Sequence, residues 1–141
     1  MVLTREELSA AMARWGVAWN EHDIDGVMDL CHEEVLFEHW TGTRVQGREE
    51  LRAAWTPWFT NHGGFHFTDE DLFIDEVEQK VLYQWQLDWP SQEQGAVGKP
   101  EHRWGVDVLH FRDGKIIRKL TYSKTLIEIE GRRIRMAPKT S

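Results

Sequence analysis

The sequence predicts an α+β domain in which a curved, mostly antiparallel sheet wraps around N-terminal helices and leaves a cone-shaped space between them. Three observations support this fold class. Helical periodicity is confined to residues 4–61, strand-like runs fill residues 65–124, and an Asp113-Gly114 pair joins the last two runs as in a tight hairpin.

Length, composition and charge narrow the class of protein. The 141 residues are 40% hydrophobic and 29% charged, so we expect one domain over residues 1–141. Its core should span residues 4–125, and the tail from 126 to 141 should add a short strand or extend freely. The net charge is -7, and the sequence contains no basic stripe that could bind nucleic acid or an anionic membrane. No apolar run approaches the roughly 20 residues that span a bilayer, and no signal peptide is evident, so we expect a cytoplasmic protein.

Three helices are predicted ahead of the strands. Thr4 and Glu7 form a capping box, and apolar residues then recur at helical spacing. Asp23 is a good N-cap for a short second helix, which we expect to include Cys31 as a buried thiol. A third helix is predicted over residues 48–61. Its inward face would carry Leu51, Ala54, Trp55, Trp58 and Phe59.

Alternation along residues 35–40 places a histidine among apolar side chains. One face of this predicted strand carries Val35, Phe37 and His39, and the other carries Leu36, Glu38 and Trp40. We expect the first face to point inward and Glu38 to form a salt bridge on the outer surface. His39 is therefore a candidate for chemistry in the interior.

The hairpin over residues 103–124 carries the second candidate. Asp107 shares a face with Leu109 and Phe111. A carboxylate on such a face is costly to bury unless it is paired, hydrogen-bonded or protonated. A structural carboxylate satisfied by its neighbours is the alternative to a functional one.

The returning strand of the hairpin has two alternative registers. A two-residue turn would put Tyr122 on the side of Asp107, whereas a bulged loop would put Lys119 there instead. The sequence does not decide between them. Neither residue is therefore assigned to the site.

Eight tryptophans are an unusual number for so short a chain. They are either core and interface residues or the lining of an aromatic cavity for an apolar ligand, and both can hold. The spacing of histidines, cysteine and acidic residues contains no metal-binding motif, and no cofactor is implied.

Two stretches resemble a known superfamily. The run AWNEHDIDGVMDLCHEEVLFEHWTG, over residues 18–42, and the run beginning VDVLHFRDGK at Val106 are similar to the nuclear transport factor 2-like (NTF2-like) superfamily, in its ketosteroid isomerase and SnoaL-like polyketide cyclase branch. The resemblance spans about residues 12–124. It implies a cone-shaped, cystatin-like fold that hosts isomerases, cyclases, dehydratases, epoxide hydrolases and binding modules.

The resemblance also implies roles for three positions. Asp107 falls on the acid that donates a hydrogen bond to the substrate oxyanion, which in ketosteroid isomerase is a carboxylic acid kept neutral by its apolar site. His39 falls on the catalytic base, which is a carboxylate in the isomerases, and Trp15 falls on the oxyanion-hole tyrosine. If His39 and Asp107 touch, Asp107 would orient the imidazole. If they lie on opposite walls, Asp107 would stay protonated and donate to the substrate.

The leading hypothesis is a cofactor-independent isomerase or cyclase acting on an apolar ketone or enone. His39 would be the general base and Asp107 the hydrogen-bond donor to the oxyanion or the partner of His39. The substrate would contact Trp15, Val35, Phe37, Trp55, Leu109 and Phe111. The alternatives are a dehydratase or hydrolase of the same fold, and a module that binds a ligand or partner without chemistry.

The outer face of the hairpin predicts an oligomer. Trp104, Val106, Val108 and His110 form a face too apolar for open solvent, and members of the superfamily commonly pair through it. We therefore expect a homodimer whose cavities open independently.

Overall fold

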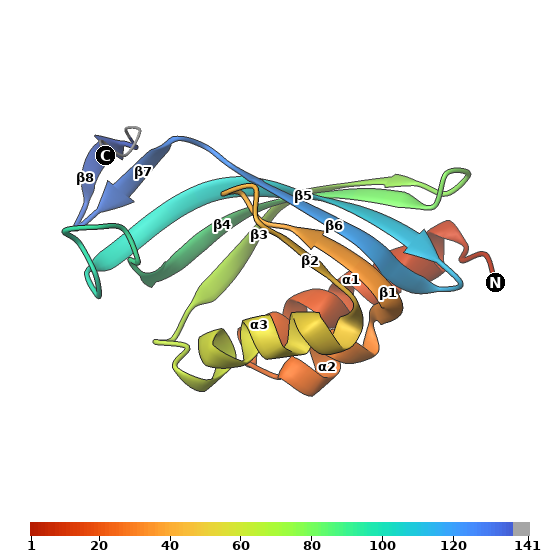
Figure 1. Cartoon of the computed structure of the whole chain (residues 1–141). Coiled ribbons are helices and arrows are strands. Elements are labelled where there is room, and N and C mark those ends of the chain that lie inside the picture. The colour runs from red at the N-terminus through yellow and green to blue at the C-terminus, as the bar shows by residue number, and fades with distance from the viewer. Residues whose placement is uncertain (137–141) are drawn as a thin grey trace.

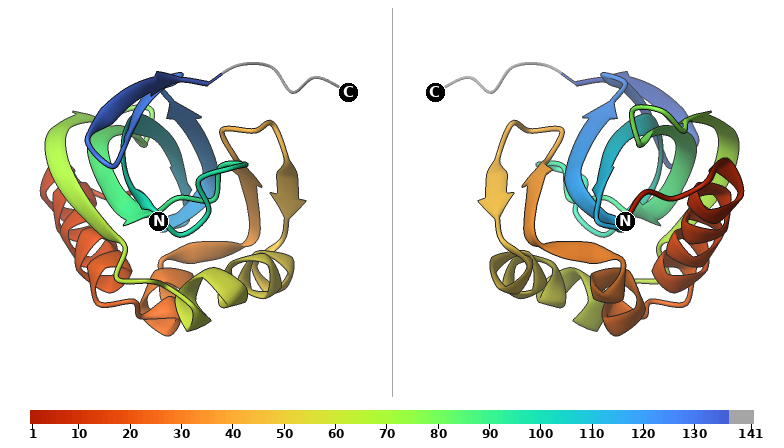
Figure 2. Two further views of the ribbon diagram at one scale, coloured as in Figure 1. Left: turned by 90° about the vertical axis from the view of Figure 1, so that its left-hand side faces the viewer. Right: turned by 90° about the vertical axis from the view of Figure 1, so that its right-hand side faces the viewer.

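Three helices lie on one side of a single curved sheet (Figure 1). The computed structural model of the chain describes residues 1–136. The helices are α1 (Arg5–Asn20), α2 (Ile24–Asp29) and α3 (Arg48–Thr60). The two end-on views show them packed across the concave side of the sheet (Figure 2). The predicted α+β class is confirmed.

The sheet has eight strands. They are β1 (Cys31–Glu38), β2 (Arg44–Gln46), β3 (His66–Asp75), β4 (Lys80–Pro90), β5 (Pro100–Arg112), β6 (Lys115–Ser123), β7 (Leu126–Ile129) and β8 (Arg132–Arg135). The main order is β2-β1-β6-β5-β4-β3, and β7 extends the sheet by pairing with β5 and β8. Only the pairing of β1 with β6 is parallel among residues 1–136, so the sheet is mostly antiparallel, as expected.

The helix starts follow the predicted capping. The Thr4 side chain accepts from the backbone N–H of Glu7, and the Glu7 side chain accepts from the N–H of Thr4. Asp23 caps α2 by accepting from the N–H of Gly26. Cys31 is buried as expected, but it begins β1 and is not in the second helix.

The hairpin between β5 and β6 combines features of both predicted registers. Asp113 and Gly114 both have positive φ, at 51° and 76°, as a two-residue turn of the favoured mirror-image type requires. Arg112 pairs with Lys115, but a bulge then leaves Ile117 unpaired before His110 pairs with Arg118. One extra residue reverses which side chains face inward. Lys119 and Thr121 are therefore buried on the Asp107 side, and Tyr122 is 52% exposed.

The main core lies between the helices and the concave face of the sheet. A second, small cluster of Ala96, Ile127 and Ile129, with Met136 packed against it, holds the β7–β8 hairpin over the β4–β5 loop. The tail therefore adds strands over residues 126–135. The part of the single-domain expectation that falls on residues 137–141 lies outside the described residues.

Candidate functional site

A cavity of about 260 Å³ lies between the concave face of the sheet and the helices. It is lined by residues of α1, of α3 and of the strands and their loops. The lining residues are Trp15, Gly16, Trp19, Phe37, His39, Trp40, Thr41, Thr43, Val45, Ala54, Trp55, Trp58, Phe67, Tyr83, Trp85, Asp107, Lys119 and Thr121.

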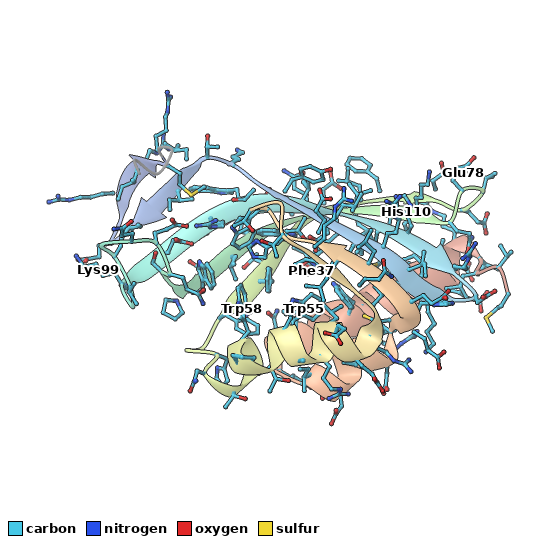
Figure 3. The ribbon with its side chains drawn as sticks, in the orientation of Figure 1. Phe37, Trp55, Trp58, Glu78, Lys99 and His110 are labelled. Carbon is cyan, nitrogen blue, oxygen red and sulfur yellow. The ribbon has the colours of Figure 1, made fainter. Side chains whose placement is uncertain are left out.

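Aromatic rings make up most of the wall. Six of the eight tryptophans line the cavity. Trp55 and Trp58 rise from α3 into the space beneath the sheet, toward Phe37 (Figure 3). Trp19 packs edge-on against Trp55 with ring centroids 4.9 Å apart. Flat apolar walls of this kind suit a planar or cyclic apolar ligand.

Asp107 lies in a buried polar group that we call the cavity cluster, formed by Asp107, Lys119 and Thr121. Lys119 Nζ lies 3.1 Å from Asp107 Oδ1, and Thr121 Oγ1 donates to the same oxygen at 2.7 Å. Lys119 Nζ also donates to Thr121 Oγ1 at 2.5 Å. No hydrogen bond within residues 1–136 goes to the other carboxylate oxygen, Oδ2. Asp107 is therefore an ion-paired acceptor with one oxygen left for a ligand.

The Lys119 ammonium lies among aromatic rings. Its Nζ is 4.8 Å from the ring centre of Phe37 and 5.8 Å from that of Trp55, within the range of cation–π attraction. The bulge at Ile117 brings Lys119 to this position, because without it the side chain would face outward. The sequence does not reveal where the bulge falls, which is why Lys119 and Thr121 were missed.

His39 lies just after the last residue of β1, in the turn that leads to β2. The backbone N–H of Thr41 donates to His39 Nδ1 at 3.2 Å, and Thr41 Oγ1 lies 3.3 Å from the same nitrogen. A backbone N–H is always a donor, so Nδ1 is the acceptor and the neutral ring carries its proton on Nε2. Nε2–H has no protein partner in the described part of the chain. It is a free donor on the cavity wall.

The surroundings of His39 keep the imidazole neutral. Burial is the largest effect and the charges of Lys119 and Arg103 add to it, which together lower the pKa of His39 from 6.5 to about 4. Asp107 opposes this shift only weakly. His39 is therefore uncharged at neutral pH and a weak base, whereas its Nε2–H remains available as a donor.

The two predicted catalytic residues line one cavity but do not touch. No hydrogen bond joins His39 to Asp107 among the described residues, and the partners of Asp107 are Lys119 and Thr121. The expected contact in which Asp107 orients the imidazole is therefore not found. Asp107 instead accepts hydrogen bonds from Lys119 and Thr121.

Of the six predicted substrate-contact residues, three line the cavity and three do not. Trp15, Phe37 and Trp55 form part of the wall. Val35, Leu109 and Phe111 are buried in the core away from the cavity wall. Alternation places these three on the inner face correctly, but it does not show how deep the cavity reaches along each strand.

Trp40 and Tyr83 are among the wall residues that were not predicted as part of the site. Trp40 was expected to face outward with Glu38, but β1 ends at Glu38 and the alternation ends with it. The Tyr83 hydroxyl donates to Asp69, and burial together with this carboxylate raises the pKa of Tyr83. Glu38 forms the expected outer salt bridge, with Arg44 at 2.7 Å.

A second buried polar group lies farther along β5. We call it the sealed cluster: Glu93, Glu101 and Arg103, with Ser91 and Trp89. The Arg103 guanidinium donates to both oxygens of Glu101 and to Glu93, at 2.9 to 3.0 Å. It also stacks on Trp40 with 4.4 Å between Cζ and the ring centre. Arg103 thereby supports one wall of the cavity from behind.

Neither a metal centre nor a membrane span is found over residues 1–136. No three histidine, cysteine or acidic side chains gather as ligands there, and none of the helices in that range combines the length and apolarity that crossing a bilayer requires.

The fold and the cavity define a cone-shaped α+β protein of the NTF2-like class. Solved structures of similar shape include a candidate ketosteroid isomerase from Kribbella flavida, which is 17% identical with a TM-score of 0.67 over 96% of this chain and 84% of that one. A candidate polyketide cyclase from Xanthomonas campestris is 20% identical, with a TM-score of 0.66 over 84% and 90%. An epoxide hydrolase from M. tuberculosis is 20% identical, with a TM-score of 0.66 over 84% of each chain. At these identities the likeness establishes the fold alone.

The family follows from the sequence profile of the SnoaL-like domain, which matches residues 12–119. The chain therefore belongs to the SnoaL-like family. A search of curated protein sequences finds no significant match.

Proposed function

We propose that the protein binds a small cyclic ketone or enone in the cavity and catalyses proton transfer at the carbon next to the carbonyl. The observation that carries this proposal is that one aromatic-lined cavity holds both a carboxylate oxygen and an N–H donor that no protein group in residues 1–136 uses. Removing such a proton requires a base for the carbon acid and a donor for the developing enolate oxygen. No cofactor is needed for this step.

The hydrogen bonds favour Asp107 as the base and His39 as the donor, the reverse of the roles expected from the resemblance. Asp107 Oδ1 is held by Lys119 and Thr121, which leaves Oδ2 to accept the proton. His39 Nδ1 is occupied by Thr41, and the ring is neutral, so Nε2–H can polarise the carbonyl. The C–H electron pair then forms the enolate double bond, and the carbonyl oxygen takes the charge beside Nε2–H.

The fate of the enolate decides the overall reaction. Protonation at a more distant carbon would isomerise an enone, and attack of the enolate carbon on a second carbonyl of the same molecule would close a ring. Relatives of similar shape include candidates for both reactions. The cavity volume of about 260 Å³ lies just below the roughly 300–1,000 Å³ typical of ligand sites, which favours a small ligand of one or two rings.

The experiment is hydrogen–deuterium exchange of β-tetralone in D₂O, followed by proton NMR. β-Tetralone is a two-ring ketone, and the loss of its α-proton signals reports the proposed step whatever the natural product is. We expect the wild-type protein to accelerate this exchange over buffer. Asp107→Asn should slow it by about 10²- to 10⁴-fold, the contribution of a general base.

The division of roles is tested by His39→Gln. Glutamine keeps an N–H donor but cannot act as a base, so exchange should fall by no more than about tenfold if His39 is a donor. A larger loss in His39→Gln than in Asp107→Asn would reassign the base to His39. Asp88→Asn and His66→Gln, which change exposed residues outside the cavity, are the matched controls.

A module that binds without chemistry is the alternative. The same cavity would then hold β-tetralone, detected by quenching of tryptophan fluorescence, while its exchange stays at the buffer rate in every variant. A dehydratase or hydrolase would also leave ketone exchange at the buffer rate, but would turn over an alcohol or an epoxide, with Asp107 activating water.

We also propose that two copies pair through the outer face of the sheet. Val106, Val108 and Leu120 are only half-buried there, next to the exposed ring of Tyr122. An apolar sheet face of this kind suits a self-complementary contact between two copies. Sedimentation velocity should give a dimer mass that Val108→Lys reduces to a monomer, and a monomeric wild type would refute the pairing.

A further inference from the structure

Gly16 lies in the interior of α1, where glycine weakens the helix. The helix runs from Arg5 to Asn20 and has a complete capping box. A glycine inside a helix destabilises it relative to alanine, because glycine loses more backbone freedom on folding. Helix formation therefore does not account for this residue.

Packing does not require a glycine at this position either. A Cβ atom built on Gly16 would meet no heavy atom within 4 Å, and the φ angle is not in the left-handed region. Gly105 in β5 provides the contrast. A Cβ atom there would collide with the Trp85 ring and with the backbone oxygen of Tyr122.

The empty space beside Gly16 belongs to the cavity. Gly16 is a lining residue between Trp15 and Trp19, which both lie on the same wall, and it is partly exposed whereas they are buried. A side chain at position 16 would therefore extend into the cavity, near the solvent.

We propose that Gly16 determines ligand size, because the missing side chain keeps open the space that a second ring of the ligand occupies. The inference rests on the proposed function in one respect, that the cavity is the ligand site. It adds a residue that takes no part in the chemistry but selects which ketones enter.

The test compares Gly16→Ala and Gly16→Leu with Ala13→Leu, a change to an exposed residue of α1 that does not line the cavity. Three probes are used: β-tetralone with two rings, cyclohexanone with one, and xenon, which binds apolar cavities. Binding of the ketones is measured by tryptophan fluorescence and binding of xenon by NMR chemical shifts. Thermal unfolding is measured on the same samples.

Gly16→Ala should raise the melting temperature by about 2–4 °C and weaken β-tetralone binding by roughly tenfold, the effect of one methyl group in a ligand pocket. Gly16→Leu should abolish β-tetralone binding and weaken xenon binding, because less of the cavity stays open, while cyclohexanone still binds. Ala13→Leu should change none of the affinities. A gain in stability together with a loss of binding would show that Gly16 keeps ligand space open and is not needed for the fold.

The inference is overturned if Gly16→Leu binds β-tetralone or xenon as the wild type does, or if the wild type takes up no xenon. Should Gly16→Leu fail to fold, Gly16→Ala decides by the same comparison. If the wild type binds xenon but neither ketone, the proposed ligand class fails, and the xenon affinities alone decide the role of Gly16.

Discussion

The cavity cluster and the sealed cluster both include inward-facing residues of β5, yet they differ in how fully their carboxylates are used. In the sealed cluster, Glu101 Oε1 accepts from Ser91 and Arg103, and Oε2 accepts from Trp89 and Arg103. In the cavity cluster, both donors converge on Asp107 Oδ1. A buried carboxylate with both oxygens hydrogen-bonded is a structural element, whereas one with a free oxygen beside a cavity can still act on a ligand.

The strand itself explains why the two clusters stay separate. Gly105 lies between Arg103 and Asp107 on the inner face of β5, and the Trp85 ring covers it so closely that a Cβ atom would collide. Trp40 covers Arg103 from the cavity side. The ligand space therefore reaches Asp107 but is closed off from Arg103, which does not line the cavity.

Neutralising one carboxylate in each cluster should have the largest and most different effects on activity. Asp107→Asn should slow β-tetralone exchange by about 10²- to 10⁴-fold. Glu101→Gln should leave the exchange rate unchanged, because Glu101 is sealed away from the cavity. The rates are measured by NMR in D₂O on samples of equal folded fraction, and equal losses in the two variants would show that the clusters do not differ in function.

The stability of the fold should depend more on the sealed cluster than on the cavity cluster. Arg103→Met leaves Glu101, which has no exposed side-chain surface, buried without its counter-ion, and breaking such a pair costs about 3–5 kcal/mol. Urea unfolding measures this as a lower midpoint at constant slope. Arg103→Lys is the control, since it keeps the charge but cannot donate to both Glu101 oxygens and Glu93 at once. A variant as stable as the wild type would contradict a structural role for the sealed cluster.

The same two clusters show where sequence reasoning succeeds and where it stops. The alternation of apolar residues predicted that His39 and Asp107 both face the interior of the fold, because strand geometry fixes which side chains share a face. It could not locate the bulge at Ile117, since one unpaired residue depends on packing over the whole sheet. Lys119 and Thr121 were therefore missed, and with them the ion pair that changes the role of Asp107.

The sequence also did not predict how far the cavity extends along each strand. Trp15, Phe37 and Trp55 line it, whereas Leu109 has the same inward orientation as Asp107 but lies in the core. Which inward residues touch a cavity depends on how the helices close over each part of the sheet. That information comes from long-range packing and not from local periodicity.

The pH dependence of stability should report the environment of His39. The folded protein holds the pKa of His39 at about 4, against 6.5 for the free side chain. Between these values the unfolded chain binds more protons, so the free energy of unfolding should decrease as the pH is lowered from 6.5 to 4. The His39 contribution is on the order of 2 kcal/mol, after allowance for solvent screening.

The measurement is the difference between the wild type and His39→Gln, because other groups titrate in the same interval in both proteins. The wild type should lose more stability than the variant between pH 6.5 and 4. Above pH 6.5 the gap between the two free energies of unfolding should no longer change with pH. An NMR titration should show one histidine C–H resonance with a midpoint near 4 that is missing in His39→Gln. Parallel stability curves for the two proteins would contradict the neutral, desolvated imidazole.

The smallest effects come from removing one hydroxyl in each cluster. Thr121→Val deletes the donor to Asp107 while keeping the side-chain shape, and Ser91→Ala deletes the donor to Glu101. Each should cost about 1 kcal/mol of stability, the typical net value of one hydrogen bond. Only Thr121→Val should alter β-tetralone exchange, by less than about tenfold, because Lys119 still holds Asp107 Oδ1. A change in exchange caused by Ser91→Ala would mean that the sealed cluster communicates with the cavity, through Arg103 and the Trp40 ring stacked on it.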